Sequence, residues 1–406
     1  MTEIVIACTV LLALVALGDV ISCWTKALIP SMAAAMIIYM LLTWVGMPKS
    51  FPETSGFAAL GDYALLILCA HLGTIVKPSE YVKNWKMIIL ALVAVISGLI
   101  FTVGIGGLIF GFDKMLAGAG ACCGGGCVSG LAAINKLDSL GLTSLIVVPT
   151  LMICAVDPLG QPIASFFVKK YVLKLNKSEA FELEKESRRR AAAEVRLTKH
   201  GVPFGSEDNP STRITNFIPK KFEEDGFLLF ELAAIVLICQ LLQNVTGLDA
   251  TFFAFFIAII GCATGVLRMN VLDRSHSYGL IITILIGYLC STMNDVTPSL
   301  FISNIAIILA LIILSALGLG IGGAVAGKFL GYDVILSAAA GIAIMFQNPG
   351  INVIIDEVSR RYSRNEEEEK FINNKIAPPL LIAVNIGFAF GLGITVTLLL
   401  PLLAKF

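Results

Sequence analysis

One acidic residue lies inside a long apolar run of the sequence. Asp157 belongs to the segment Cys154-Ala155-Val156-Asp157-Pro158-Leu159-Gly160-Gln161-Pro162, within a mostly apolar stretch from about 143 to 170. Carboxylates are rare in membrane segments because they are costly there, and they mark ion or proton pathways. Each proline removes a backbone N–H, which frees carbonyl oxygens beside the carboxylate. The segment therefore predicts a Na+ or H+ site on a proline-broken backbone, with an acid at the membrane interface as the alternative.

A glycine-rich interruption precedes this segment. It reads Cys122-Cys123-Gly124-Gly125-Gly126-Cys127-Val128-Ser129. Each glycine costs a helix about 1 kcal/mol relative to alanine, so three together predict a break. At membrane depth, irregular backbone is tolerated only inside protein or against a cavity, and the N–H groups of the next helix start favour an anion. A close-packed helix seam is the alternative. The predicted substrate-binding residues here are Gly124, Gly125, Gly126, Cys127 and Ser129.

A second interruption reads Phe346-Gln347-Asn348-Pro349-Gly350-Ile351-Asn352. Pro349-Gly350 ends a helix, and the amides at membrane depth are typical of a functional site, since polar groups are costly there. A turn in a surface loop is the alternative. Amide N–H groups suit a carboxylate and amide oxygens suit Na+. We predict substrate contacts from Gln347, Asn348, Gly350 and Asn352, and Na+ ligands from Asp157, Asn348 and Asn294.

The elements that must position these residues are membrane helices. The chain has 406 residues, of which 57% are hydrophobic and 14% charged, and its mean hydropathy is +0.88. About 20 apolar residues cross a bilayer. The first apolar run has no basic region before it, so we expect a retained helix rather than a signal peptide. Ten spans are predicted at 3–22, 28–46, 57–76, 87–110, 143–170, 227–246, 250–267, 276–294, 299–326 and 377–402. The polar, glycine-rich segments 115–137 and 334–357 are predicted as re-entrant or broken elements.

The distribution of basic residues predicts an orientation. If the N-terminus is outside and each span crosses once, the short loops on the inside carry most of the lysine and arginine. Cytoplasmic loops carry that excess in membrane proteins. The outside then receives only Lys49, Lys114, Lys136 and Lys405. We expect both termini outside and the charged linker 175–225 in the cytoplasm.

The two halves of the chain repeat at an offset of about 220 residues. Gly111-Phe112-Asp113 pairs with Gly331-Tyr332-Asp333, and Pro78-Ser79 pairs with Pro298-Ser299. Five crossings are an odd number, so the second copy enters from the opposite face. This predicts an all-α polytopic membrane protein of two inverted repeats, 1–174 and 226–406, each with a broken re-entrant hairpin. Inverted repeats are the architecture of many secondary transporters.

Other classes of function lack their motifs. We find no Walker A, GxSxG or HExxH sequence, and three histidines leave little for zinc hydrolysis. Cys122, Cys123 and Cys127 do not have the spacing of a zinc site. The net charge of zero indicates no nucleic-acid partner. We expect a protein without enzymatic activity or an organic cofactor.

The chain resembles the sodium/glutamate symporter family and the related 2-hydroxycarboxylate transporters. Five spans per half, a cytoplasmic joint and a late broken loop in each half carry the resemblance. Gly124-Gly125-Gly126-Cys127 is similar to the Gly-Gly-x-Gly motif of that family, whereas the segment 346–350 lacks a double glycine. The resemblance implies Na+-coupled uptake of a small carboxylate such as glutamate, by an elevator motion in a homodimer of a bacterial inner membrane.

Two other functions stay open at this stage. A cation/proton antiporter would use Asp157 as the exchanging acid, and broken helices also occur in that class. A passive channel or a receptor is the third class. A saturable rate that depends on a coupling ion would argue against a channel.

Overall fold

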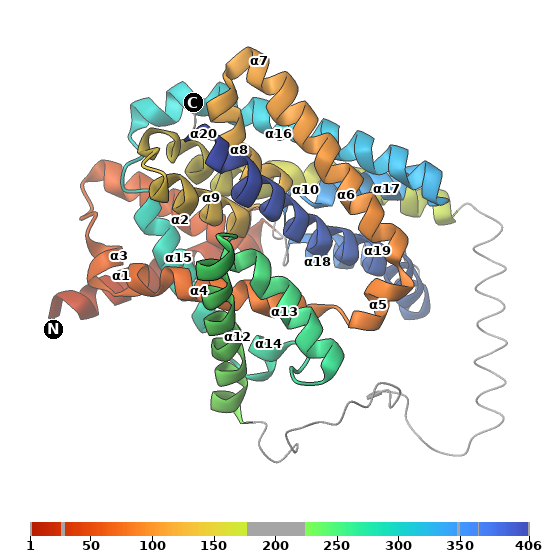
Figure 1. Ribbon diagram of the computed structural model, residues 1–406, viewed down its shortest axis with the longest axis horizontal. Helices are drawn as coiled ribbons and strands as arrows, with labels where there is room; N and C mark the ends of the chain where they lie inside the picture. The colour runs from red at the N-terminus through yellow and green to blue at the C-terminus, as the bar shows by residue number, and fades with distance from the viewer. Residues whose placement is uncertain (1, 26–28, 177–223, 347–349, 364, 405–406) are drawn as a thin grey trace.

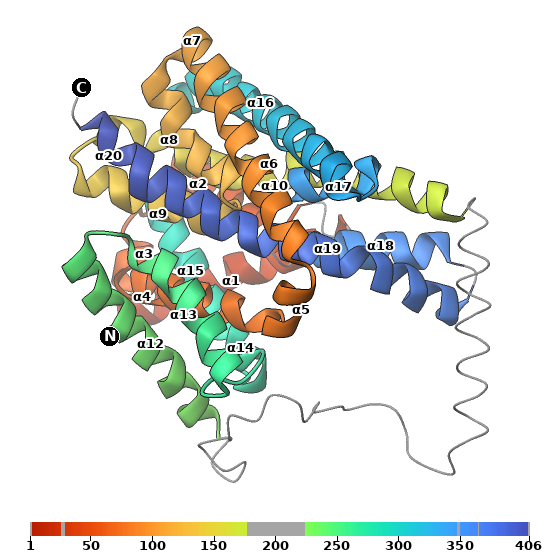
Figure 2. The same cartoon turned by 45° about the vertical axis from the view of Figure 1, so that its right-hand side comes forward.

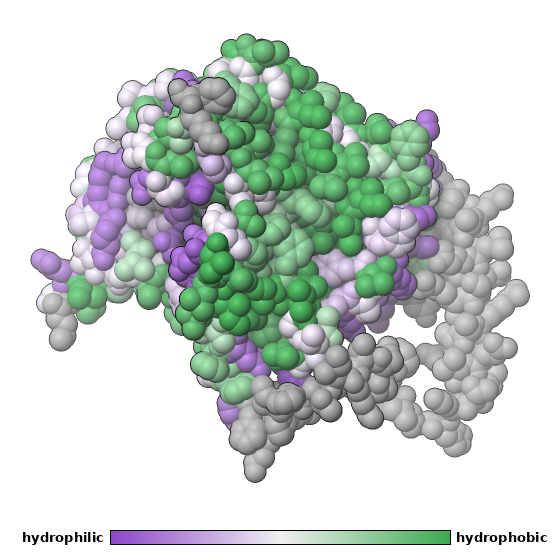
Figure 3. Space-filling model, viewed as in Figure 1, coloured by the Kyte–Doolittle hydropathy of each residue, from purple (hydrophilic) through white to green (hydrophobic). Residues whose placement is uncertain are grey.

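A computed structural model describes residues 2–25, 29–176, 224–346, 350–363 and 365–404 of the chain. These residues form helices, and no strand occurs among them. Seven helical stretches within them are long and apolar enough to cross a membrane, and four shorter apolar helices accompany them. Figure 3 shows a broad hydrophobic surface over the face that carries α6 and α16. The chain is an all-α protein with the features of a polytopic membrane protein.

The first half begins with three apolar helices, α1 (Thr2–Trp24), α2 (Ser31–Val45) and α4 (Phe57–Ile75), with the short α3 (Phe51–Thr54) between the last two. The short α5 (Pro78–Lys83) leads into a continuous helical stretch of α6 (Trp85–Leu99), the π-helix η1 (Ile100–Ile105) and α7 (Gly106–Phe110). A broken pair, α8 (Phe112–Cys123) and α9 (Cys127–Ser139), follows. The turn η2 (Thr143–Leu145) and the long α10 (Val147–Asn176) complete this half.

The second half has a similar order of helices, without counterparts of α5 and η2. It contains α12 (Asp225–Thr246), α13 (Ala250–Thr264), the short α14 (Val271–Arg274) and α15 (Tyr278–Thr292). The longest helix, α16 (Pro298–Leu330), comes next, and then α17 (Val334–Ala343) and α18 (Gly350–Tyr362). The chain ends in α19 (Glu366–Leu392), the π-helix η4 (Gly393–Leu399) and α20 (Leu400–Leu403).

The helices pack as two bundles. In the α4 bundle, α4 contacts α12, α13, α14 and α15, while α1 packs on α2 and α2 on α15. In the α16 bundle, α6, α8, α10 and α17 pack on α16, α9 packs on α8 and α10, and α19 contacts α6, α17 and α18. Figure 1 and Figure 2 both show α6 and α16 side by side. Contacts between α2 and α10 join the bundles.

Glycines allow α6 and α16 to approach closely. A Cβ on Gly318 of α16 would lie 2.8 Å from the Ser97 carbonyl oxygen of α6, and one on Gly322 would lie 3.0 Å from the Cα of Ala94. On the other side of α16, a Cβ on Gly323 would lie 2.4 Å from the Ser337 carbonyl oxygen of α17. Small residues of this kind drive association of membrane helices, because apolar burial gains little in lipid. The glycines of α16 thus hold both neighbours at backbone contact.

Every predicted span coincides with a helix, but three helices are shorter than predicted. α2, α13 and α15 have 15 residues each, which reach about 22 Å, less than the roughly 30 Å hydrocarbon core of a bilayer. The helix ends at αL glycines in two of them, Gly46 and Gly265. Hydropathy alone did not detect these stops. Most of the predicted linker, 177–223, lies outside the described residues.

The predicted proline break in the Asp157 segment is wrong. α10 continues from Val147 to Asn176 with Pro158 and Pro162 inside it. Proline still removes a donor, so the carbonyl oxygens of Cys154 and Pro158 have no i+4 N–H partner. The helix persists because it is packed against α8, α9, α16, α17 and α18, which hold the turns on either side in place.

Asp333 fastens the start of α17 to the end of α10. Its Oδ1 accepts hydrogen bonds from the backbone N–H groups of Ile335 and Leu336, at 2.8 and 3.3 Å. Its Oδ2 accepts a hydrogen bond from Lys174 Nζ at 2.6 Å. Partial burial raises the pKa of the Asp333 carboxyl, but these hydrogen bonds and the Lys174 charge outweigh it and hold the pKa below its usual value.

We expect Asp333 to stabilise the fold through its ionised form. Because the folded pKa is lowered, the contribution is present at neutral pH and is lost as the pH falls through that pKa. Asp333→Asn keeps a helix cap and should cost less than about 1 kcal/mol, whereas Asp333→Ala also removes the cap and should cost about 1 kcal/mol more. Thermal unfolding of the parent and the two variants in detergent, at neutral and at acid pH, measures the order of their stabilities. Equal midpoints for the parent and both variants at neutral pH would contradict it.

Candidate functional site

The glycine turn has a backbone that only glycine adopts readily. Gly125 has φ 92° and Gly126 has φ 67° with ψ −117°. The Gly126 N–H donates to the Ala121 carbonyl oxygen at 2.8 Å, and the Ser129 hydroxyl donates to the Gly124 carbonyl oxygen. Residues with a Cβ are strained in these conformations. The hydroxyl of Ser129 closes the turn through this hydrogen bond, and its predicted contact with a substrate stays a prediction.

The turn is also tightly packed against α19. A Cβ on Gly391 would lie 2.0 Å from the Cys123 carbonyl oxygen and 2.5 Å from the Cα of Gly124. A Cβ on Gly124 would lie 2.7 Å from Ser129 Oγ. Real Cβ atoms do not approach other atoms this closely, so glycine is required at 391 for the contact with the turn, and at 124 for the contact of the turn with Ser129. The broken backbone of the first half thus rests directly on the last long helix of the second half.

Asp157 lies beside this turn. A Cβ on Gly126 would be 3.1 Å from Asp157 Oδ1 and 3.3 Å from the Met345 carbonyl oxygen. Asp157 Oδ1 is buried and has no hydrogen-bond partner in the described residues. The carboxylate is next to the N-terminus of the 13-residue helix α9, whose dipole favours a negative charge. A carboxylate with an oxygen that lacks a partner, close to a backbone carbonyl, provides the kind of hard oxygen ligands that bind a cation.

A cavity of about 340 Å³ lies beside Asp157, at the boundary between the two bundles. The α16 bundle contributes Gly125, Cys127, Val128 and Asp157 to its wall. The α4 bundle and the connection between α1 and α2 contribute Val15, Asp19, Pro30, Ser31, Met32, Leu68, Leu72, Ile75, Tyr278, Gly279, Ile282, Thr283 and Ile286. At the tip of α9, the thiol of Cys127 donates to Met32 Sδ at 3.2 Å. The cavity connects the glycine turn and the carboxylate with the boundary along which the bundles meet.

Apart from the start of α9, four helix ends lie around this cavity, and the chain order puts them on one face of the protein. They are the ends of α1 and α4 and the starts of α2 and α15. An ion pair of 3.6 Å between His276 Nδ1 and Asp225 Oδ1 places the start of α12 at the same face. Since the linker precedes α12, we call this the linker face. The cavity therefore lies toward the linker face.

The charged side chains in the cavity wall are both acidic. Asp19 and Asp157 line it, and no lysine, arginine or histidine does so in the described part of the chain. The Cys127 and Val128 N–H groups belong to the first turn of α9, which leaves its donors without helical partners. The cavity thus offers carboxylates to a cation and a helix N-terminus to an anion. Sequence reasoning missed Asp19, whose signal was a carboxylate inside the apolar run 3–22.

The structure brings together only some of the predicted site residues. The first group, Gly124 to Ser129, forms one turn, and Asp157 lies against it. Gly350 begins α18 beside Gln161, where a Cβ would be 2.7 Å from Gln161 Nε2, and Asn352 is exposed on that helix. The Gln161 amide nitrogen is buried without a partner in the described residues. Gln347 and Asn348 lie outside the described residues, so their predicted roles stay predictions.

Asn294 does not reach the cavity. Its Oδ1 accepts a hydrogen bond from Tyr39 at 2.6 Å, and its Nδ2 donates to the Lys49 carbonyl oxygen at 2.9 Å. It lies eight residues beyond Ile286, the cavity residue nearest to it on α15, or about 12 Å at helical rise. Its predicted place as a ligand beside Asp157 therefore needs correction, because the side chain is engaged in joining α15 to the end of α2.

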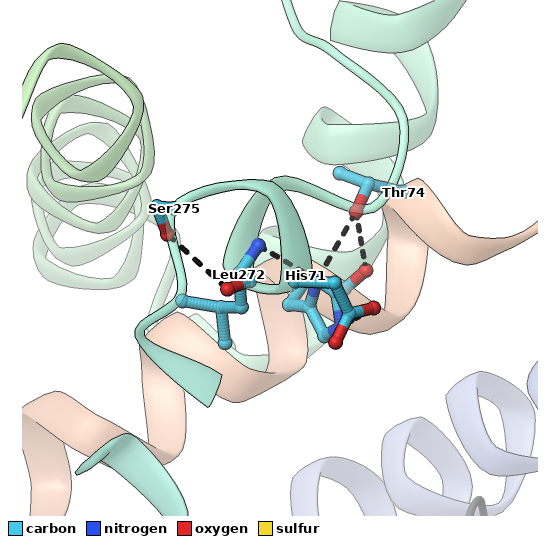
Figure 4. Close-up of polar contacts among 5 residues, drawn as sticks. His71, Thr74, Leu272 and Ser275 are labelled. Carbon is cyan, nitrogen blue, oxygen red and sulfur yellow. Dashed lines mark hydrogen bonds and ion pairs between the residues drawn. The ribbon is translucent and has the colours of Figure 1, made fainter. Parts of the chain in front are cut away.

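His71 has a structural role near the linker face (Figure 4). Its Nδ1 accepts the Leu272 N–H at 3.4 Å and lies 3.3 Å from Thr74 Oγ1, while Nε2 is 3.9 Å from Asp273 Oδ2. The side chain is 2% exposed. The hydrogen bond that its Nδ1 accepts from the Leu272 N–H ties α4 to α14. Groups of three or more histidine, cysteine or acidic residues that could hold a metal ion are absent from the described residues.

No protein-family model matches the chain, and no curated protein matches it. The resemblance to sodium/glutamate symporters therefore rests on the residues quoted for it and stays a prediction.

Proposed function

We propose that the protein is a secondary active transporter that couples Na+ to the movement of a small carboxylate, with sodium/glutamate symporters as its relatives in organisation. The observation that carries the proposal is the cavity between the bundles, where a broken helix and a buried carboxylate meet. In such transporters substrate and coupling ion bind where helices are interrupted, because only interrupted helices expose backbone groups. The N-terminus of α9 would receive the carboxylate, and Asp157 would bind Na+.

The packing of the halves supports two inverted repeats. The pair α8 and α9 contacts α10 as α17 and α18 contact α19, α1 packs on α2 as α12 packs on α13, and α6 packs on its counterpart α16. In an inverted repeat the two units exchange conformations, and the site opens to each side in turn. The α16 bundle would carry the site past the α4 bundle in an elevator motion. In the predicted orientation the linker face is cytoplasmic, so the cavity would belong to the inward-facing state.

Cys127 provides a test of the cavity as a binding site. It lines the cavity and is partly exposed, so a membrane-impermeant thiol reagent should modify it in liposomes. We expect Na+ together with the transported carboxylate to slow this modification at least about threefold, because bound ligand excludes the reagent. Cys23, which is exposed and outside the cavity, is the internal control and should keep its rate. Peptide mass spectrometry measures both rates, and a Cys127 rate unaffected by Na+ and by every carboxylate tested would argue against binding here.

The cation/proton antiporter is the second candidate. The observation that favours it is the pair of carboxylates, Asp19 and Asp157, in a cavity wall without a described basic residue. In that function Asp157 would exchange Na+ for a proton, and no organic solute would move. A pH-sensitive dye trapped in liposomes distinguishes Na+/H+ exchange from Na+ symport. If a Na+ pulse changes the pH of the lumen when no organic solute is present, the result supports exchange.

A further inference from the structure

Three side chains from distant parts of the sequence form one polar network. Asn135 Nδ2 donates to Asp62 Oδ1 at 2.7 Å. The Tyr288 hydroxyl lies 2.6 Å from Asn135 Oδ1 and 3.0 Å from Asp62 Oδ1. A phenol has one proton, so it donates to one of these oxygens at a time while the other remains within reach. Each member therefore contacts both others, and the three form a closed ring of contacts.

The network joins the two bundles. Asp62 lies on α4 and Tyr288 on α15, both in the α4 bundle, whereas Asn135 lies on α9 in the α16 bundle. α9 is also the helix whose start forms the glycine turn, and Asn135 lies eight residues, or about 12 Å, after Cys127. The hairpin of α8 and α9 is thus joined to the α4 bundle at its tip by Cys127 and Met32, and near its base by this network.

The network lies beyond the end of the cavity that is remote from the linker face. The cavity wall uses α4 from Leu68 to Ile75 and α15 from Tyr278 to Ile286. Asp62 precedes the first of these stretches and Tyr288 follows the second, so both lie toward the opposite face. The cavity would open on that face only if α9 separated from α4 and α15 there. That separation breaks the contacts of Asn135 with both partners.

We infer that Asp62, Asn135 and Tyr288 form a latch that keeps the cavity closed on the face opposite the linker. The inference rests on the proposed function for the existence of a second state that is open on that face. Each lost hydrogen bond removes stabilisation from the closed state alone, because the open state does not contain it. The latch therefore determines the population of the state that is open on the opposite face. Its three residues are distinct from those of the proposed binding site.

Thiol accessibility tests the latch without any substrate. In liposomes of defined protein orientation, a membrane-impermeant methanethiosulfonate reagent is added to one face at a time, and peptide mass spectrometry gives the Cys127 rate. We expect Tyr288→Phe and Asn135→Ala to raise the rate from the opposite face about two- to tenfold, the range that one lost hydrogen bond gives. The rate of Cys127 modification by reagent added at the linker face should change little, because the state that is closed on the opposite face stays the most populated one. Tyr63→Phe, a neighbouring and exposed α4 tyrosine, is the control and should behave as the parent.

Two outcomes would overturn the latch. One is an unchanged opposite-face rate in both variants. The other is a lower unfolding midpoint with no change in the ratio of the Cys127 modification rates from the two faces. That result would mean that the network only stabilises the fold. If the opposite-face rate rises while no solute is carried by a Na+ gradient, the latch is supported and the proposed Na+ symport is not. If uptake is Na+-driven and the rates do not change, the proposed function stands and the latch fails.

Discussion

Asp157→Asn is expected to weaken Na+ binding and so to impair Na+-driven uptake. The variant keeps the size and polarity of the side chain but removes the negative charge beside Gly126 and the Met345 carbonyl. Removing one partner of a buried charge pair costs about 3–5 kcal/mol, so the Na+ concentration for half-maximal uptake should rise at least about 100-fold. Initial uptake rates over a series of Na+ concentrations, in liposomes, measure this shift.

Two controls make the Asp157 result specific. Asp113→Asn removes an exposed carboxylate at the start of α8, outside the cavity wall, and should keep the parental Na+ dependence. Asp157→Glu keeps the charge and should retain part of the coupling. Gel filtration of the purified variants shows whether each one is folded. A folded Asp157→Asn protein with parental Na+ dependence would exclude Asp157 as the cation ligand.

Gly391→Ala should impair transport although residue 391 does not line the cavity. Its new Cβ would lie 2.0 Å from the Cys123 carbonyl oxygen and 2.5 Å from the Gly124 Cα. Both are backbone atoms that cannot rotate away, so either the glycine turn or α19 must shift. Overpacking of this kind costs about 1–3 kcal/mol, and displacement of the turn should lower the uptake rate about tenfold or more.

The matched control is Gly226→Ala at the start of α12. A Cβ on Gly226 has no heavy atom within 4 Å, so uptake and the thermal midpoint should stay at the parental values. Uptake and thermal unfolding in detergent are measured for both variants. Parental uptake by Gly391→Ala would show that the turn tolerates displacement, against its role in positioning the α9 N-terminus.

The sequence predicted the geometry of the candidate site best where the signal was local. Three adjacent glycines break a helix in any context, and the break at Gly124–Gly126 was therefore predictable. Asp157 was identified because a carboxylate in an apolar run is rare. Asp19 has the same signal, but it lies near the end of its run, where an acid is easily assigned to the membrane interface. The prolines of α10 gave a local signal that was misleading. Proline normally breaks a helix, but packing on neighbouring helices keeps α10 continuous through Pro158 and Pro162.

Contacts between distant segments could not be predicted from one sequence. Asn294 and Asn135 are both amides near helix ends, yet the first ties α2 to α15 and the second links the hairpin to the α4 bundle. Their partners are separated from them by 255 and 73 residues. No local pattern encodes such pairings, because they depend on how the bundles pack. The contact of Gly391 with the glycine turn could not be predicted from the sequence for the same reason.

Uptake by the purified protein in liposomes is the direct test of Na+-coupled carboxylate transport. Labelled carboxylates and amino acids are supplied one at a time, with and without an inward Na+ gradient. We expect at least one small carboxylate to accumulate only when the Na+ gradient is present, and Asp157→Asn to lose this accumulation. If no solute accumulates and Na+ exchanges for protons instead, Na+ symport is contradicted, and the antiporter with Asp157 as its exchanging acid takes its place.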